Sequence, residues 1–173
     1  MEAQIVGSIL SGIIASVCFA VLMLLIRPII KVSNKMTVQR GAVSVYKVKV
    51  VNKTFAMLTN VKYSLHYCVD YDDGTTDITE IKPMKEKLSV IDRYSPFDKQ
   101  GIYAVRISYE VDENKFPMKD NTRMVFTILA DHAISNTTAC KKVDYKAENI
   151  VEAIFETGKS TKAIYTEHKN FSK

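Results

Sequence analysis

Hydrophobic residues form one long continuous run near the N-terminus. No charged residue occurs from Ile5 to Ile26, and most of these positions are Ile, Leu, Val or Phe. A helix over this run is roughly 33 Å long, which matches the roughly 30 Å hydrocarbon layer of a bilayer. The pattern predicts a transmembrane helix over residues 5–26, within an N-terminal segment 1–30.

A cleaved signal peptide is the alternative interpretation of this run. Such a peptide has a basic region before the apolar core and small residues at a cleavage site after it. Residues 1–4 contain no basic side chain, and Arg27 and Pro28 stand where a cleavage site would lie. We therefore expect an uncleaved membrane anchor.

The second pattern is alternation of apolar and polar residues with period two, which predicts half-buried β-strands. It is clearest in NVKYSLHYCVD, residues 60–70, where Tyr63, Leu65 and Tyr67 share one face, and it recurs in IYAVRISYEVDE, residues 102–113. Weaker strands are expected at 43–51, 75–81, 88–94, 123–130 and 138–145.

Seven strands at this spacing predict a mainly β protein, with one antiparallel Ig-like β-sandwich of about seven to eight strands following the helix. We assign residues 42–173 to the sandwich and residues 31–41 to a basic juxtamembrane linker. Residues 147–158 fit either a short helix or a further strand, and the sequence leaves both open.

Positive charge is concentrated just after the apolar run. The chain of 173 residues has a net charge of +5, and Arg27, Lys31, Lys35 and Arg40 follow the predicted span. Basic flanks are retained on the cytoplasmic side, so we expect a cell (inner or plasma) membrane protein with its N-terminus outside and its domain in the cytoplasm. The same four side chains are expected to contact anionic lipid headgroups.

A ridge of small side chains runs along the predicted span. These residues recur every four positions, a spacing that lets two membrane helices approach closely. A homo-oligomer through the helix is one interpretation, and the ordinary frequency of small residues in membrane spans is the other. The ridge consists of Ser8, Gly12, Ser16 and Ala20.

The acidic stretch DYDDGTTD, residues 70–77, resembles a calcium loop in its spacing of aspartates. Counting from Asp70, the fifth, sixth and twelfth positions of an EF-hand would be Gly74, Thr75 and Ile81, which do not fit the pattern. Asp73-Gly74 between two alternating runs instead predicts a hairpin turn.

Other catalytic or metal-binding chemistry is not evident. His66, Cys68, His132 and Cys140 form no paired metal-binding motif and are expected to be free surface residues. Two isolated cysteines outside the span fit a reducing compartment, with one disulfide as the alternative. No nucleophile elbow, phosphate loop or dinucleotide motif occurs, so we expect no enzyme activity, metal or cofactor.

The stretch YKVKVVNKTFAMLTNVKYSLHY, residues 46–67, resembles the opening of bacterial Ig-like modules such as the CARDB-type adhesion repeats. The usual glycine after the asparagine pair is replaced by Thr54. The resemblance implies a sandwich, although those modules are mostly extracellular. Overall, the chain is similar to small single-pass bacterial membrane proteins of unassigned function. The matching positions are Tyr46, Val48, Val50, Asn52, Asn60, Val61, Tyr63 and Leu65.

The sequence thus favours a non-catalytic, single-pass membrane protein that presents its sandwich at the cytoplasmic face as a protein-interaction or assembly module. Its expected partners are the lipid bilayer, an unidentified protein and a second copy of the helix, and not nucleic acid. One alternative is an effector that senses a small ligand and perturbs the bilayer through oligomerised spans, which resembles certain antiphage effectors in arrangement. Another is an extracytoplasmic adhesion or envelope module.

Overall fold

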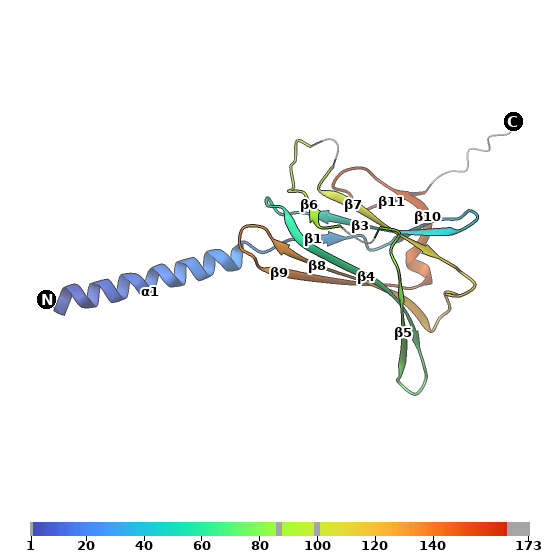
Figure 1. Ribbon diagram of the computed structural model, residues 1–173, viewed down its shortest axis with the longest axis horizontal. Coiled ribbons are helices and arrows are strands. Elements are labelled where there is room, and N and C mark those ends of the chain that lie inside the picture. The colour runs from blue at the N-terminus through green and yellow to red at the C-terminus, as the bar shows by residue number, and fades with distance from the viewer. Residues whose placement is uncertain (1, 86–87, 99–100, 166–173) are drawn as a thin grey trace.

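A computed structural model describes residues 2–85, 88–98 and 101–165, which form one long helix followed by a two-sheet β domain (Figure 1). Helix α1 (Glu2–Leu25) extends away from the domain. None of its Val6–Met23 segment is buried against the rest of the chain, and by length and composition this segment can cross a membrane.

The first sheet follows the helix directly and contains six strands. Strands β1 and β2 lie end to end along one side of β3, and β7 pairs antiparallel with the other side. β10 extends the sheet by pairing in parallel with β2, and β11 pairs with β10. The strands are β1 (Ile30–Val32), β2 (Met36–Gln39), β3 (Ser44–Asn52), β7 (Ala104–Val111), β10 (Ile150–Phe155) and β11 (Ala163–Tyr165).

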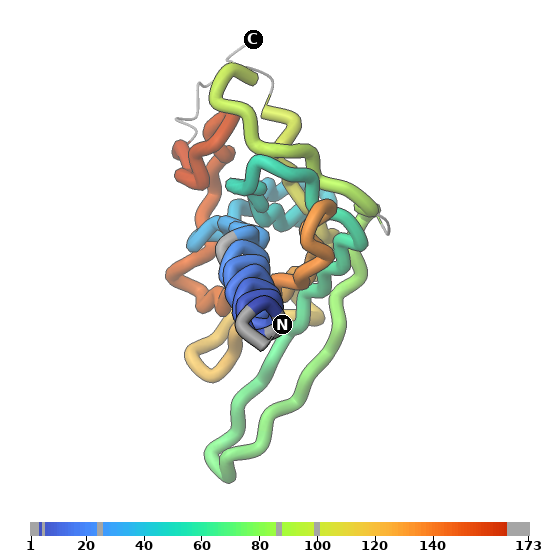
Figure 2. Tube along the Cα trace, turned by 90° about the vertical axis from the view of Figure 1, so that its left-hand side faces the viewer, coloured from blue at the N-terminus to red at the C-terminus, as the bar shows by residue number. Residues whose placement is uncertain are grey.

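The second sheet packs against the first and is antiparallel throughout. Its order is β5–β4–β8–β9, with the short β6 paired to the start of β4. The β4–β5 hairpin projects from the body of the domain (Figures 1 and 2). The strands are β4 (Leu58–Asp70), β5 (Thr76–Ile81), β6 (Val90–Ile91), β8 (Thr122–His132) and β9 (Thr138–Tyr145).

The core lies between the two sheets and is built from the alternating faces. Leu65 of β4, Tyr109 of β7 and Phe126 of β8 are each fully buried. The Tyr145 hydroxyl donates a 2.6 Å hydrogen bond to the carbonyl of Ser33, joining the two sheets. Burial of these large apolar side chains is the main term that stabilises the sandwich.

The predicted fold class is confirmed: the chain is mainly β, with an N-terminal apolar helix and a sandwich-like pair of sheets. Two details differ. The described residues contain eleven strands, because β1, β2 and β11 have only three or four residues each and show no readable period, and β10 forms in the segment that the sequence left open. Moreover, the predicted linker 31–41 contributes to β1 and β2 and therefore belongs to the sandwich.

The segment left open at 147–158 forms a single 3-10 turn followed by a strand. The turn η1 spans Ala147–Asn149, and β10 begins at the next residue. Ala153 and Phe155 of this strand are buried, and the strand is held by pairing with β2 and β11. The sequence could not decide between helix and strand, because the strand forms by pairing with β2, which is distant in the sequence, and with β11, which follows it.

Candidate functional site

The helix is joined to the domain by a hydrogen-bonded junction. The Ser135 hydroxyl, in the turn between β8 and β9, donates to the carbonyl oxygen of Ile26 at 2.9 Å, and the Thr137 hydroxyl approaches the same oxygen at 3.4 Å. The last carbonyls of a helix have no partner within the helix, so this turn caps α1. His132, which is fully buried, orients the turn by accepting a 3.1 Å bond from the Ser135 amide at Nδ1.

The segment after the helix is held just as closely. The Ile29 amide donates to the Thr54 hydroxyl at 2.7 Å, and the Lys53 amide donates to the Ile29 carbonyl at 2.8 Å. The Ala133 amide donates to the Met57 carbonyl at 3.1 Å, which links the β3–β4 and β8–β9 turns. These bonds leave the chain no flexible linker between the helix and β1.

The four predicted headgroup residues do not lie together. Arg27 and Lys31 are exposed beside the junction. Lys35 donates to the Tyr165 hydroxyl at 3.3 Å. Arg40 lies at the far end of the sheet. On β3, Asn52 pairs with Ile30 near the junction, and Val45 pairs with Gln39, the residue before Arg40. These two β3 positions are seven residues apart, which corresponds to about 23 Å along the strand.

Arg40 also has protein partners at that far end. Its guanidinium lies 3.5 Å from Glu113 and 3.4 Å from Glu152. The structure therefore brings Arg27 and Lys31 to the helix end and places Arg40 away from it. A reading of charge along the chain could not show this, since β1 and β2 carry the later residues away from the helix.

The junction also carries exposed apolar side chains, which we call the collar. They lie on loops that have no periodicity, so the sequence pattern did not single them out. The sequence signal that could have identified them is the presence of large apolar residues at turn positions, such as 55 and 134. The collar consists of Ile29, Phe55, Met57 and Ile134.

A buried lysine lies in the first sheet. Lys49 of β3 is only 1% exposed and donates through Nζ to the carbonyl of Glu156. Arg106 stands opposite it on β7 and donates to the Phe155 carbonyl at 3.1 Å. Burial, and then the charge of Arg106, lowers the pKa of Lys49 to about 8.

The acidic stretch forms the predicted hairpin turn. Gly74 has a φ of +82°, and its amide donates to the Tyr71 carbonyl at 3.0 Å. One Asp73 oxygen accepts bonds from the Thr75 hydroxyl and amide at 2.6 and 2.9 Å, which lowers the pKa of Asp73. Asp77 accepts from the Tyr71 hydroxyl at 2.8 Å. These carboxylates are thus held by neighbouring hydroxyl and amide groups of the hairpin.

The soft candidate ligands are dispersed. Cys68 and His132 are buried, so the expectation that they are surface residues is wrong, whereas Cys140 is exposed. Cys68 lies on the central strand β4, flanked in register by Ile78 and Arg123, whose larger side chains can shield it. In the part of the chain that the structure describes, no group of three or more His, Cys, Asp or Glu side chains is placed to hold a metal.

A cavity of about 260 Å³ opens between the sheets, lined by residues such as Tyr63, Leu88 and Val105. Pockets for drug-sized ligands usually hold about 300–1,000 Å³. This cavity is therefore smaller than such a pocket, whereas a more open hollow that shares Met84 with it has a volume of about 550 Å³.

The small-residue ridge is exposed, like the rest of the Val6–Met23 segment, in the described part of the chain. No heavy atom outside the helix lies within 4 Å of a Cβ built on Gly12. The Ser8 and Ser16 hydroxyls donate to carbonyls within the helix, to Gln4 at 2.9 Å and to Gly12 at 2.8 Å. The ridge therefore presents no unpaired serine hydroxyl to a lipid or helix neighbour.

Comparison with models of known protein families finds none that matches this chain. Comparison with curated proteins likewise finds no relative. The functional assignment therefore depends on the geometry of the junction and of the sheet edges.

Proposed function

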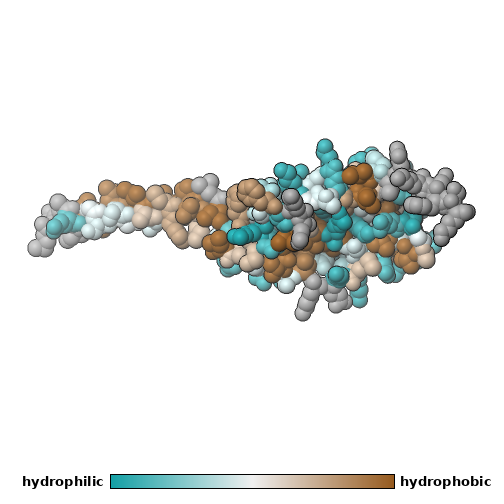
Figure 3. Space-filling view, turned by 90° about the horizontal axis from the view of Figure 1, so that it is seen from above, coloured by the Kyte–Doolittle hydropathy of each residue, from teal (hydrophilic) through white to brown (hydrophobic). Residues whose placement is uncertain are grey.

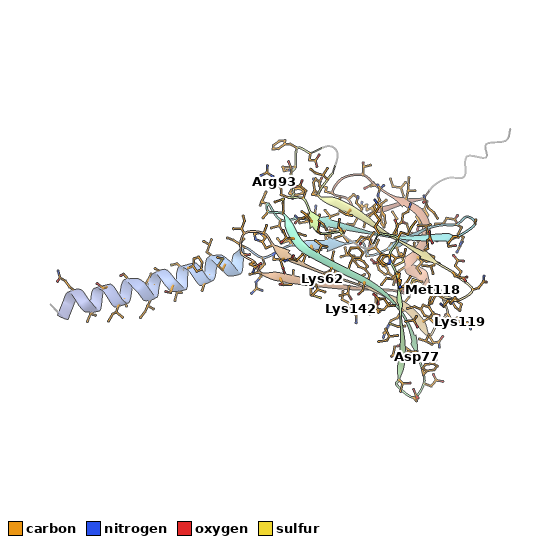
Figure 4. The ribbon with its side chains drawn as sticks, in the orientation of Figure 1. Lys62, Asp77, Arg93, Met118, Lys119 and Lys142 are labelled. Atoms are coloured by element: carbon orange, nitrogen blue, oxygen red, sulfur yellow. The ribbon has the colours of Figure 1, made fainter. Side chains whose placement is uncertain are left out.

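We propose that this protein is a non-catalytic, single-pass membrane protein whose sandwich, held at the cytoplasmic face, recruits another protein by strand addition. The observation that carries the proposal is the open edge of β5, at the end of its sheet on the projecting hairpin (Figure 4, Asp77). The residues of β5 from Thr76 to Glu80 are all exposed. An exposed sheet edge offers main-chain donors and acceptors to an extended peptide.

The register of the hairpin shows which β5 groups face the open edge. The Asp70 amide donates to the Asn121 carbonyl at 2.9 Å, on the side of β4 away from β5. Asp70 and its partner Thr76 are therefore a non-hydrogen-bonded pair, and alternate residues of an antiparallel ladder share this state. Thr76, Ile78 and Glu80 consequently direct their amides and carbonyls outward.

The junction supports recruitment at the membrane because it fixes the orientation of the sandwich relative to the helix. The hydrogen bond from the Ser135 hydroxyl to the helix end and the hydrogen bond from the Ile29 amide to the Thr54 hydroxyl leave no flexible segment between the anchor and the domain. The positive flank that includes Arg27 and Lys31 supports a cytoplasmic location. The acidic side chains of Asp77 and Glu80 favour a partner strand that carries basic residues opposite them.

The test is site-specific photocrosslinking in cells that express the full chain. A benzoylphenylalanine placed at Thr79 is expected to capture a protein. Ile78→Pro removes one outward amide and should abolish this adduct, whereas Ile78→Ala keeps the amide and should retain it. An absent adduct, or equal capture by the alanine and proline variants, would contradict strand addition.

A further inference from the structure

We infer that the collar, formed by Ile29, Phe55, Met57 and Ile134, is a lipid-binding surface that inserts into the interface of an anionic bilayer. This inference rests on the membrane anchor of the proposed function and adds a second contact between the domain and the bilayer. The exposed fractions of the four side chains range from 44% for Met57 to 80% for Phe55. The free energy of the system falls when a membrane interface covers apolar side chains that are this exposed.

The collar is continuous with the end of the candidate span. Ile134 immediately precedes Ser135, which bonds the Ile26 carbonyl, and Phe55 immediately follows Thr54, which bonds the Ile29 amide. Viewed along the helix, the β3–β4 turn (teal) and the β8–β9 turn (orange) lie beside the helix end (Figure 2). Apolar surface on the helix likewise continues to the adjoining end of the domain (Figure 3). If α1 crosses the bilayer, these turns lie at its surface.

Basic and aromatic residues surround the collar. The Lys53 ammonium lies 5.1 Å from the centre of the Tyr94 ring, and the Phe55 and Tyr94 rings meet edge to face at 6.4 Å. Arg93 is exposed near the helix side of the domain (Figure 4), and Arg27 follows the helix. Aromatic rings are enriched at bilayer interfaces, and each lysine or arginine near an anionic surface contributes about 1 kcal/mol.

Two other features of the charges near the collar favour an anionic ligand. Burial, followed by the positive charges of Lys31 and Lys159, lowers the pKa of Lys53. Asp131 accepts bonds from Thr138 at 2.6 Å and from Asn60 at 2.9 Å. The acidic side chain thus has local partners, and the crowding of cations around Lys53 favours an anionic ligand.

The bilayer is the occupant that fits because the span itself brings it there. A protein partner would have to enter between the domain and the membrane, within a few residues of the helix end. An anionic lipid surface meets both the apolar side chains and the surrounding cations at once.

The test places a fluorophore on the collar of the full chain. In a background of Cys18→Ala, Cys68→Ala and Cys140→Ser, an environment-sensitive dye is attached at Ile134→Cys and, as the matched control, at Ile78→Cys. Ile78 is also an exposed isoleucine, at 65% against 74%, and its partner Cys68 lies ten residues along β4 from the junction, about 30 Å away. The proteins are reconstituted in vesicles of phosphatidylcholine, with or without phosphatidylglycerol.

At residue 134 we expect blue-shifted emission and strong quenching by lipids that carry a nitroxide near the headgroup. The dye at residue 78 should emit as in water and escape quenching. Lys53→Gln with Arg93→Gln should reduce the shift at residue 134 in vesicles with phosphatidylglycerol and leave it unchanged without that lipid.

Three results would overturn the inference. The first is a dye at residue 134 that behaves like the one at residue 78. The second is a blue shift that grows with protein density and resists nitroxide lipids, which would identify a second protein copy. The third is insensitivity to phosphatidylglycerol. Vesicle flotation separates this inference from the anchor: a chain that floats with unquenched dye refutes the collar alone, whereas a chain that does not float refutes both.

Discussion

Replacing the buried Lys49 with methionine should stabilise the domain near pH 7 and lose that advantage in alkali. The pKa of Lys49 falls from its usual 10.5 to about 8, because burial and then Arg106 disfavour the charged form. At about 1.36 kcal/mol per pKa unit, this shift is worth at most about 3 kcal/mol. Lys49 also lines an open hollow together with Gly101 and Gly158, and water in that hollow reduces the cost of burying the charge, so we take about 2 kcal/mol.

The direction of the pH dependence follows from proton binding. Between pH 8 and 10.5 the unfolded chain binds more protons at Lys49 than the folded chain, so folded stability rises with pH across this window. Below pH 8 both states are protonated and the cost of burying the charge is fully present. Methionine removes that cost and also the hydrogen bond from the Lys49 ammonium to Glu156, worth about 1.5 kcal/mol because the donor is charged. We expect a net gain of about 0.5 kcal/mol at neutral pH.

The assay is urea unfolding of the full chain in nonionic detergent, followed by tyrosine near-UV circular dichroism, since the chain has nine tyrosines and no tryptophan. Burial raises the pKa of Tyr109 and Tyr145, which lowers stability at high pH in both proteins and cancels in the comparison. From pH 7 to about pH 10 the difference should move by about 2 kcal/mol in favour of the lysine. A constant difference, or a destabilised Lys49→Met at pH 7, would refute the reasoning.

Three further predictions concern the helix and its surroundings. Gly12→Ile should separate associated spans in a crosslinking assay, whereas Leu22→Ile should not, and equal association in both would exclude the ridge as a contact. Ser135→Ala should remove about 1 kcal/mol of helix capping and speed amide hydrogen exchange at the junction about fivefold, and unchanged exchange would contradict the capping role. Cys140 should resist an impermeant thiol reagent in intact cells and react on lysis, whereas Cys68 should react only after unfolding. Labelling of Cys140 from outside would place the domain extracytoplasmically.

The sequence alone determined the elements whose pattern is local. The apolar run predicts α1 because its length matches a bilayer, and alternation predicts β4 and β7 because each exposes one face to the core. The Asp73-Gly74 turn could be predicted for the same reason, since glycine accepts positive φ within four residues of chain.

The tertiary structure decided everything that depends on contacts between distant residues. The Ser135 hydroxyl meets the Ile26 carbonyl across 109 positions, and no sequence period reports such a bond. Lys49 alternates like its polar neighbours, yet it is buried because the chain just after β10 passes close to it and Glu156 supplies a carbonyl. Arg40 adjoins the basic flank in sequence but lies far from the helix, because β1 and β2 each rise about 3.3 Å per residue along β3. Periodicity records which way a side chain points, whereas burial and partnership depend on what the rest of the chain brings to that side.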